Sequence, residues 1–295
     1  VTKFGAVGDD ATDDTAAIKL AFAAKNKIYF PPKVFLVTSS IDVTSIDDVV
    51  VTGFGATLKE SSGALASMLS FVLCNNLKIS GLHFESNEDY AYFQANSPTE
   101  RRSHIYLQQC LHADVSNVSG ESKRNFILNY LSDHTKISNF SFVGFLADVS
   151  GGALSNTNNC PAVHLRGGSY NVVTTGSVNN HGSAVLVELT SEHLSISGIT
   201  GEELHDNGVY VSSGANCTVS NCSFRNSLGD GVKLRGTNLI AQGCSGYNLT
   251  TTVHVSGVNP ADSSGAGGWG TVVSGNASYN CSRCVYVSMA NTLYM

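Results

Sequence analysis

A short phrase of alternating apolar and variable residues recurs along most of the chain. Its first and third positions are apolar, and its second and fourth positions vary. The phrase occurs at residues 105–108, 126–129, 163–166, 185–188, 209–212, 232–235, 253–256 and 285–288. Alternation with a period of two predicts β-strands that bury one face. We therefore expect the first and third positions to lie in a core and the other two to face solvent.

A second phrase, apolar-x-apolar-x-x-apolar, repeats in step with the first. It begins at Leu194, Cys217 and Leu239, which are 23 and 22 residues apart, and it occurs earlier at residues 77–82 and 137–140. Each repeat thus holds two short strands, with Gly and Asn between them and no helical periodicity. This pattern predicts an all-β parallel β-helix, a solenoid whose rungs stack about 4.8 Å apart and place equivalent positions in ladders.

One segment near the N-terminus has helical periodicity instead. Between residues 13 and 25, one helical face carries Ala17, Ile18, Ala21 and Phe22. The Thr and Asp residues at 12–14 can cap its start, and the helix can cover the open end of the first rung. We expect an N-terminal motif with a capping helix over residues 1–27 and the β-helix over 28–295. Because Met295 follows closely on the last phrase, we expect the chain to continue there or to be capped by partners.

The composition agrees with a solenoid and excludes several other classes. The chain is 42% hydrophobic but only 14% charged, and it contains 38 Ser, 25 Asn, 29 Gly and 5 Pro. These proportions exclude collagen, coiled coils and disorder, and no apolar run approaches the roughly 18 residues of a membrane span. The net charge of −6 disfavours nucleic acid as the main partner. Residues 1–8 lack the basic start and apolar run of a secretory signal peptide.

The eight Cys residues do not form a dense disulfide framework. Cys222 and Cys244 occupy the same position in successive repeats, so we expect them, with Cys217, to fill the core as free thiols. The pair Cys281 and Cys284 has the spacing of half a zinc site but lacks a second ligand pair. We therefore predict neither a metal site nor a cofactor.

The N-terminal residues carry a resemblance to a known family. The run VTKFGAVGDDATDDTAAIK at residues 1–19, followed by IYFPPKVFLV at 28–37, resembles the N-terminal motif of the pectate-lyase-like right-handed parallel β-helix family. Within that family the chain is most similar in style to bacteriophage tailspikes and polysaccharide depolymerases. The resemblance implies a homotrimer in the virion tail, made in the host cytoplasm, that binds and cleaves a glycan at the bacterial surface.

The acidic run of this motif has a structural interpretation. Gly5 and Gly8 suit tight turns, and the Asp residues between positions 9 and 14 suit turn closure and helix capping. A calcium loop from Asp9, Asp10 and their neighbours is the alternative, but it lacks the bidentate Glu of an EF-hand. We expect this run to be part of the scaffold.

The solvent-facing positions of the first phrase concentrate the few charges of the chain. The second positions are Tyr106, Ile127, His164, Leu186, Tyr210, Lys233, His254 and Tyr286. The fourth positions are Gln108, Asn129, Arg166, Glu188, Ser212, Arg235, Ser256 and Ser288. Tyr can lie against sugar rings, and Arg and Lys can bind acidic groups. We predict that a glycan binds to His164, Arg166, Tyr210, Lys233, Arg235 and His254. Alternatively, these are ordinary polar surface positions, with Arg166 and Glu188 a cross-strand ion pair.

Glycoside hydrolysis needs two carboxyl groups that flank one bond. Asp206 and Asp230 precede successive phrases, so we expect them on adjacent rungs, about 5–8 Å apart. We predict that these two residues are catalytic, together with Glu188 and with His205 as a proton shuttle. Because Asp-Gly and Asp-Asn-Gly are common turn formers, a purely conformational role is the alternative.

Three functions are compatible with these residues. We favour a tailspike-type glycoside hydrolase that cleaves capsule, O-antigen or teichoic acid. A polysaccharide lyase is the first alternative, in which Lys233, Arg235 or Arg166 neutralises a uronate and Tyr210, His164 or His254 acts as the base. The second alternative is a fibre or adhesin that binds glycan without cutting it.

Overall fold

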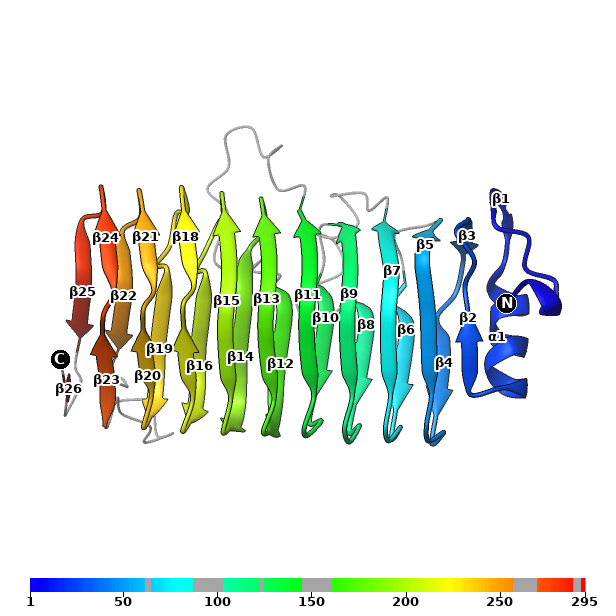
Figure 1. Ribbon diagram of the computed structural model, residues 1–295, viewed down its shortest axis with the longest axis horizontal. Coiled ribbons are helices and arrows are strands. Elements are labelled where there is room, and N and C mark those ends of the chain that lie inside the picture. Colours follow the sequence, from blue (N-terminus) through cyan, green and yellow to red (C-terminus); the bar gives the residue numbers. More distant parts are fainter. Residues whose placement is uncertain are drawn as a thin grey trace. The chain divides into compact units, whose positions relative to one another are not determined.

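The computed structural model describes residues 1–61, 65–86, 103–122, 125–144, 161–256, 270–288 and 293–294. They belong to two compact units, Val1–Val143 and Gly144–Met295. Within the described part of each unit, the chain forms short strands that pair in parallel, rung upon rung (Figure 1). This architecture confirms the predicted all-β parallel β-helix. No helix among the described residues is long and apolar enough to cross a membrane.

The first unit contains a 3-10 turn η1 (Thr2–Phe4), one described helix α1 (Thr15–Ala24) and strands in two sheets. The first sheet has β1 (Asp9–Asp13), β3 (Val34–Val37), β5 (Val50–Glu60), β7 (Lys78–Ser86), β9 (Asp114–Glu121) and β11 (Lys136–Val143), with β2 (Lys27–Tyr29) also beside β5. The second has β4 (Ile41–Thr44), β6 (Ser67–Val72), β8 (Ser103–Gln108) and β10 (Asn125–Tyr130).

The second unit repeats this plan. One sheet has β13 (Val172–Asn179), β15 (Ser195–Glu202), β17 (Thr218–Ser220), β20 (Ile240–Gln242), β23 (Thr271–Ser274) and β26 (Leu293–Tyr294), with β18 (Ser223–Arg225), β21 (Ser245–Tyr247) and β24 (Ala277–Tyr279) alongside. The other has β12 (Pro161–Ser169), β14 (Ser183–Glu192), β16 (Val209–Ala215), β19 (Val232–Thr237), β22 (Thr251–Ser256) and β25 (Arg283–Ser288).

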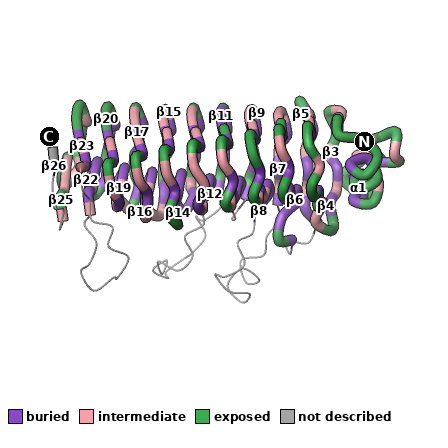
Figure 2. The backbone as a smooth tube through the Cα atoms, turned by 90° about the horizontal axis from the view of Figure 1, so that it is seen from below, coloured by how far each residue is buried: buried purple, intermediate pink, exposed green. Residues whose placement is uncertain are grey.

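The core consists of the columns that the apolar positions predicted. The third positions of the first phrase, such as Val187, Val211 and Leu234, are fully buried. Along β16 and β19, buried positions alternate with partly exposed ones (Figure 2). Ile196 pairs with Val219 and Val219 with Ala241, which confirms the repeat steps of 23 and 22 residues. The last phrase differs, since Val287 of β25 is 36% exposed.

The predicted register of residues 126–129 is wrong by one position. Ile127 pairs with Ile105, and Asn129 pairs with Leu107. Ile127 and Asn129, which we expected to face solvent, therefore lie in the core columns, and both are fully buried. A slip of one residue turns every side chain to the other face of a sheet. Because residues 126–128 are all apolar, alternation could not define the register there.

The number of strands per repeat also differs from the prediction. In the later repeats of the second unit, the second phrase is divided into two strands, so that each repeat holds three. The division falls at Asn221, Gly243 and Gly275, whose φ angles of 52°, 63° and 63° are left-handed. Asn and Gly adopt this conformation at low cost, and it turns the chain between short strands.

The predicted capping helix is present as α1, at the end of the first unit (Figure 1). It buries Ile18, Ala21 and Phe22, whereas Ala17 is only partly buried. The ring of Phe22 meets the ring of Phe71 in β6 edge-on, with 6.1 Å between centroids. The helix therefore covers core residues of the first rungs, as expected.

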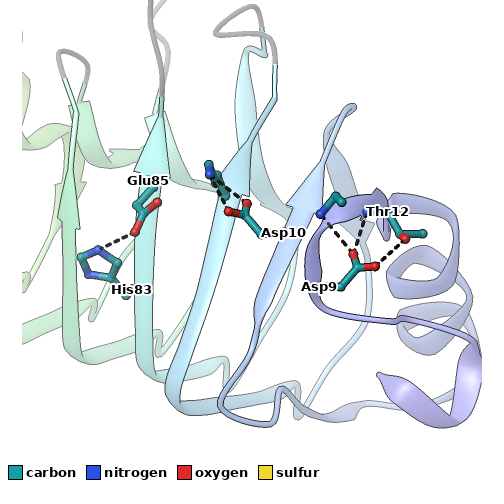
Figure 3. A network of polar contacts seen from close by, with 7 residues as sticks. Asp9, Asp10, Thr12, His83 and Glu85 are labelled. Carbon is teal, nitrogen blue, oxygen red and sulfur yellow. Dashed lines mark hydrogen bonds and ion pairs between the residues drawn. The ribbon is translucent and has the colours of Figure 1, made fainter.

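The acidic run before α1 closes turns, as predicted. The carboxylate of Asp9 accepts hydrogen bonds from the backbone N–H groups of Ala11 and Thr12 and from the Thr12 hydroxyl (Figure 3), and these bonds lower its pKa. The Asp14 carboxylate accepts from the N–H groups of Val7 and Gly8, and Gly8 has a left-handed φ of 66°.

The cysteines of the second unit fill the core, as predicted. Cys217, Cys222 and Cys244 are each 1% exposed, and all three are free thiols. Burial raises the pKa of Cys217 to about 11. The prediction for the chain after Met295 concerns a residue outside the described part and stays a prediction.

Truncation of the core residue Phe224 should destabilise the protein strongly. Phe224 is 1% exposed and packs so closely against Gly208 that a Cβ atom at residue 208 would clash with its ring. We expect Phe224→Ala to lower the free energy of unfolding by about 3–5 kcal/mol, because it leaves a cavity. Leu228→Ala, at a side chain that is 71% exposed, should change it by less than about 0.5 kcal/mol. Urea denaturation of both variants checks this, and equal effects would contradict the assigned core.

Candidate functional site

The charged and aromatic residues of the first phrase form a ladder on one sheet of the second unit. The pairing runs in the order His164, Leu186, Tyr210, Lys233, His254 and Tyr286. In the fourth-position column, Arg166 pairs with Glu188, and Ser256 pairs with Ser288. The structure thus brings the predicted binding residues into one sheet, on β12, β16, β19 and β22. The expectation that all second positions face solvent is wrong for His164 and Leu186, which are 3% and 7% exposed.

At one end of the ladder, Glu188 lies between two basic side chains. Its Oε2 is 3.1 Å from Nε2 of His164 and 3.9 Å from Nε of Arg166. The His164 side chain is only 4% exposed, whereas those of Arg166 and Glu188 are about one third exposed. The cross-strand contact between Arg166 and Glu188, which we considered as an alternative, is therefore present. A catalytic role for Glu188 stays a prediction.

The middle of the ladder combines an aromatic ring with cations. The Lys233 ammonium lies over the Tyr210 ring, 5.0 Å from its centroid. Both side chains are partly exposed, and Arg235 follows two residues later on the same face of β19. A ring that packs against a sugar, next to cations that bind an acidic substituent, suits a charged glycan.

At the other end, three polar side chains are linked by hydrogen bonds. Nδ1 of His254 is 2.7 Å from Oδ2 of Asp230, and Nε2 of His254 is 3.1 Å from the Ser288 hydroxyl. The ring of Tyr286 packs against the His254 ring, with 4.8 Å between centroids. Sequence analysis placed Ser288 on the ladder but missed this link. The link could have been found from the register: His254 pairs with Tyr286, and Ser288 is two residues after Tyr286 on the same face of the strand.

The two predicted catalytic carboxylates lie at adjacent corners but are offset by one residue. The backbone N–H of Asp230 donates to Oδ1 of Asn207, and the N–H of Gly229 donates to the carbonyl oxygen of Asp206. Oδ2 of Asp206 accepts a hydrogen bond from Ser183 at 3.2 Å, on the preceding rung. Asp230 instead contacts His254, on the following rung. The two carboxyl groups thus have different surroundings, with a neutral hydroxyl at one and an imidazole at the other.

His205, the predicted proton shuttle, is half-buried beside Asp206. Its Nε2 is 3.3 Å from Oδ1 of Asn180, and its backbone N–H donates to the carbonyl of His181. Burial lowers the pKa of His205, and the nearby Glu203 opposes this effect in part. The neutral imidazole is therefore favoured, which suits a group that accepts a proton.

The part of the chain that the structure describes contains no group of three or more His, Cys, Asp and Glu side chains arranged to hold a metal ion. Of the two cysteines with half-site spacing, Cys281 is partly buried and Cys284 is exposed.

Comparison with protein families gave one match. A family model described as rhamnogalacturonase A/epimerase, pectate lyase-like, matches residues 1–233. A comparison with curated protein sequences gave no match.

Solved structures share the fold at low sequence identity. ORF18 of Geobacillus virus E2 has a TM-score of 0.67 and 16% identity, over 97% of this chain and 60% of that one. An endo-xylogalacturonan hydrolase from Aspergillus tubingensis has a TM-score of 0.67 and 16% identity, over 98% and 97%. A tailspike protein of E. coli bacteriophage HK620, in complex with a pentasaccharide, has a TM-score of 0.66 and 13% identity, over 96% and 57%. This chain therefore spans about 60% of the length of the two viral proteins.

His205 should make the stability of the protein depend on pH. Its pKa is lowered in the folded protein, whereas that of an unfolded histidine is about 6.5. Between these two values the unfolded chain binds more protons, so stability falls as the pH drops below about 6.5 and is fully present above it. We expect His205→Gln to lose less stability than the parent protein between pH 7.5 and pH 5.5 in urea denaturation.

His112→Gln, at an exposed histidine of the first unit, is the control for this measurement. The control should show the same loss between the two pH values as the parent protein. An unchanged pH dependence in His205→Gln would contradict the assigned environment of His205.

Proposed function

Since the chain belongs to the rhamnogalacturonase A/epimerase, pectate lyase-like family, we propose that it is a tailspike-type depolymerase that binds and cleaves a bacterial surface polysaccharide. This membership confirms the resemblance seen in the N-terminal motif. The observation that supports the proposal is the ladder of charged and aromatic side chains beside Asp206 and Asp230. Capsule, O-antigen and teichoic acid are the substrate classes that fit such a surface.

The ladder is suited to binding an extended chain of sugars. Its rungs are about 4.8 Å apart, so side chains on successive strands can contact successive parts of one polymer. Tyr210 offers a ring for packing, while Lys233, Arg235 and Arg166 offer positive charge for carboxylate or phosphate groups. His254 lies at one end of this binding surface, and the buried His164 contacts Glu188 at the other.

The cleavage proposed is glycoside hydrolysis by Asp206 and Asp230. One carboxyl group donates a proton to the leaving oxygen, and the other activates water or attacks the sugar carbon. Asp230 contacts an imidazole nitrogen, which suits the ionised carboxylate that acts as base or nucleophile. We assign the role of acid to Asp206, at the adjacent corner. His205 can exchange protons with solvent, and Glu188 is a further carboxylate within the same ladder.

A lyase is the second candidate, and the register of Lys233 with His254 favours it. A cation on one rung and a basic nitrogen on the next can neutralise a uronate and remove its α-proton. The products of the two reactions differ, because only elimination leaves an unsaturated uronate. Ultraviolet absorbance of the products distinguishes them.

The proposal also includes a localisation and an oligomeric state. As a tailspike-type protein, the chain would act in a virion tail at the bacterial surface after synthesis in the host cytoplasm. We expect a homotrimer, with a solution mass three times the 31.0 kDa of one chain. Analytical ultracentrifugation measures this mass, and a monomer at all concentrations would contradict the predicted assembly.

Replacement of either catalytic carboxylate should abolish cleavage but not binding. We expect Asp206→Asn and Asp230→Asn to lower the rate of glycan cleavage at least about 100-fold, because each removes a proton donor or acceptor. Asp42→Asn, at an exposed aspartate of β4, is the matched control and should leave the rate unchanged. Chain length and new reducing ends are followed on capsule, lipopolysaccharide and teichoic acid preparations.

Two outcomes of that experiment would count against the proposal. Full activity in both variants would remove these carboxylates from the mechanism. Tight binding of intact glycan, with unchanged chain length across the whole panel, would indicate a fibre or adhesin instead of an enzyme.

A further inference from the structure

Asp230, His254 and Ser288 form one chain of hydrogen bonds on three successive rungs of the second unit. Asp230 lies just before β19, His254 is in β22, and Ser288 ends β25. The carboxylate is 2.7 Å from Nδ1 of the histidine, and the hydroxyl is 3.1 Å from Nε2. Each distance is within the range of a hydrogen bond between such groups. The proposed hydrolysis uses the Asp230 carboxylate but leaves the Ser288 hydroxyl without a role.

The two contacts together determine which ring nitrogen carries the proton. An ionised carboxylate can only accept hydrogen bonds, so Nδ1 of His254 must donate to Asp230. In a neutral imidazole the other nitrogen is then an acceptor, and Nε2 faces the Ser288 hydroxyl. The hydroxyl proton therefore points at a base that is ready to take it. A serine oriented in this way is an activated nucleophile.

The carboxylate and the imidazole of this group are largely shielded from solvent. The side chains of Asp230 and His254 are 12% and 15% exposed, so water competes little for their contact. Ser288 is partly exposed. A substrate can therefore reach the hydroxyl while the carboxylate and the imidazole stay shielded.

Aromatic and cationic neighbours complete the surroundings. The Tyr286 ring packs against the His254 ring at 4.8 Å and limits its rotation. The Arg283 guanidinium lies over the Tyr286 ring, with its Cζ 4.1 Å from the ring centroid.

We propose that Ser288, His254 and Asp230 form a serine esterase centre that removes O-acyl groups, such as acetyl esters, from a glycan. The choice of a glycan ester rests on the proposed function, because the centre lies at the end of the same ladder. The chemistry of the three side chains does not depend on it, since any small acyl ester can react with an activated serine.

The reaction proceeds in two balanced steps. Oγ of Ser288 attacks the ester carbonyl carbon while Nε2 of His254 takes the hydroxyl proton, and Asp230 stabilises the resulting imidazolium. The tetrahedral intermediate collapses, the C–O bond to the sugar breaks, and His254 returns the proton to the leaving sugar oxygen. Water, deprotonated by His254, then attacks the acyl-serine carbon and releases the carboxylic acid, and Ser288 regains its proton.

Ester cleavage by two serine variants tests the centre. We expect Ser288→Ala to lower the rate of 4-nitrophenyl acetate hydrolysis, and of acetate release from O-acetylated polysaccharide, at least about 100-fold. Ser256→Ala is the matched control, because Ser256 pairs with Ser288 in the neighbouring strand. It should retain the parent rate. Circular dichroism of both variants verifies that they are folded.

Covalent labelling provides a second measurement that does not need turnover. A fluorophosphonate probe should add its mass to the peptide that contains Ser288, and to no other serine of the folded protein. Labelling should be lost in His254→Gln, which cannot take the hydroxyl proton, and retained in Ser256→Ala. Acetate release that persists in Ser288→Ala, or absence of the label from Ser288 in the folded parent protein, would overturn the proposal.

The esterase and the depolymerase can fail separately. Glycan chain length, measured in the same reactions as acetate release, reports the depolymerase separately from the esterase. Loss of acetyl groups without shortening would support the esterase and contradict the depolymerase. If the glycan is shortened but Ser288→Ala and Ser256→Ala release acetate at the same rate, the result would support the depolymerase and contradict the esterase.

Discussion

Backbone hydrogen bonding between one rung and the next, in fixed register, is the constraint on which the rest of the structure depends. In the second unit, Val185 pairs with Val209, Val209 with Val232 and Val232 with Val253. Because the pairing is parallel, each side chain is stacked on its equivalent about 4.8 Å away. The apolar columns are buried as far as β22, and the polar columns bring side chains of neighbouring rungs next to one another. The same pairing of strands therefore produces both the buried core and the functional ladder.

The turns between strands follow the same constraint and explain the composition. Corner residues repeat in register, so a left-handed Asn at one corner is stacked on the next. Nδ2 of Asn238 donates to Oδ1 of Asn216, and Nδ2 of Asn248 donates to Oδ1 of Asn226. Small polar residues satisfy one another in this way without charge, whereas like charges stacked at this spacing repel. Only 14% of the residues are charged, and the charged residues of the ladder are those to which we assign a role in binding or catalysis.

Register also gives chemically equivalent residues different roles. Asp206 and Asp230 both precede a strand at a Gly-containing corner, yet one accepts a hydrogen bond from a serine on the rung before and the other contacts a histidine on the rung after. A shift of one residue along the corner is enough to turn the second carboxylate towards His254. His254 in turn contacts Ser288, two residues beyond its paired residue Tyr286, so that side chains from three successive rungs form one group.

The sequence by itself determined the fold class, the repeat length, the buried columns, the capping helix and the order of the ladder, because each depends on a periodic or local pattern. It could not determine the register where the pattern is uniform, as at Phe126–Leu128, nor the division of strands at Asn221. The tertiary structure alone decided which side chains meet across rungs: Glu188 between His164 and Arg166, and His254 between Asp230 and Ser288. Such contacts depend on the offset between neighbouring strands and on side-chain direction, and these are set only when the rungs pair.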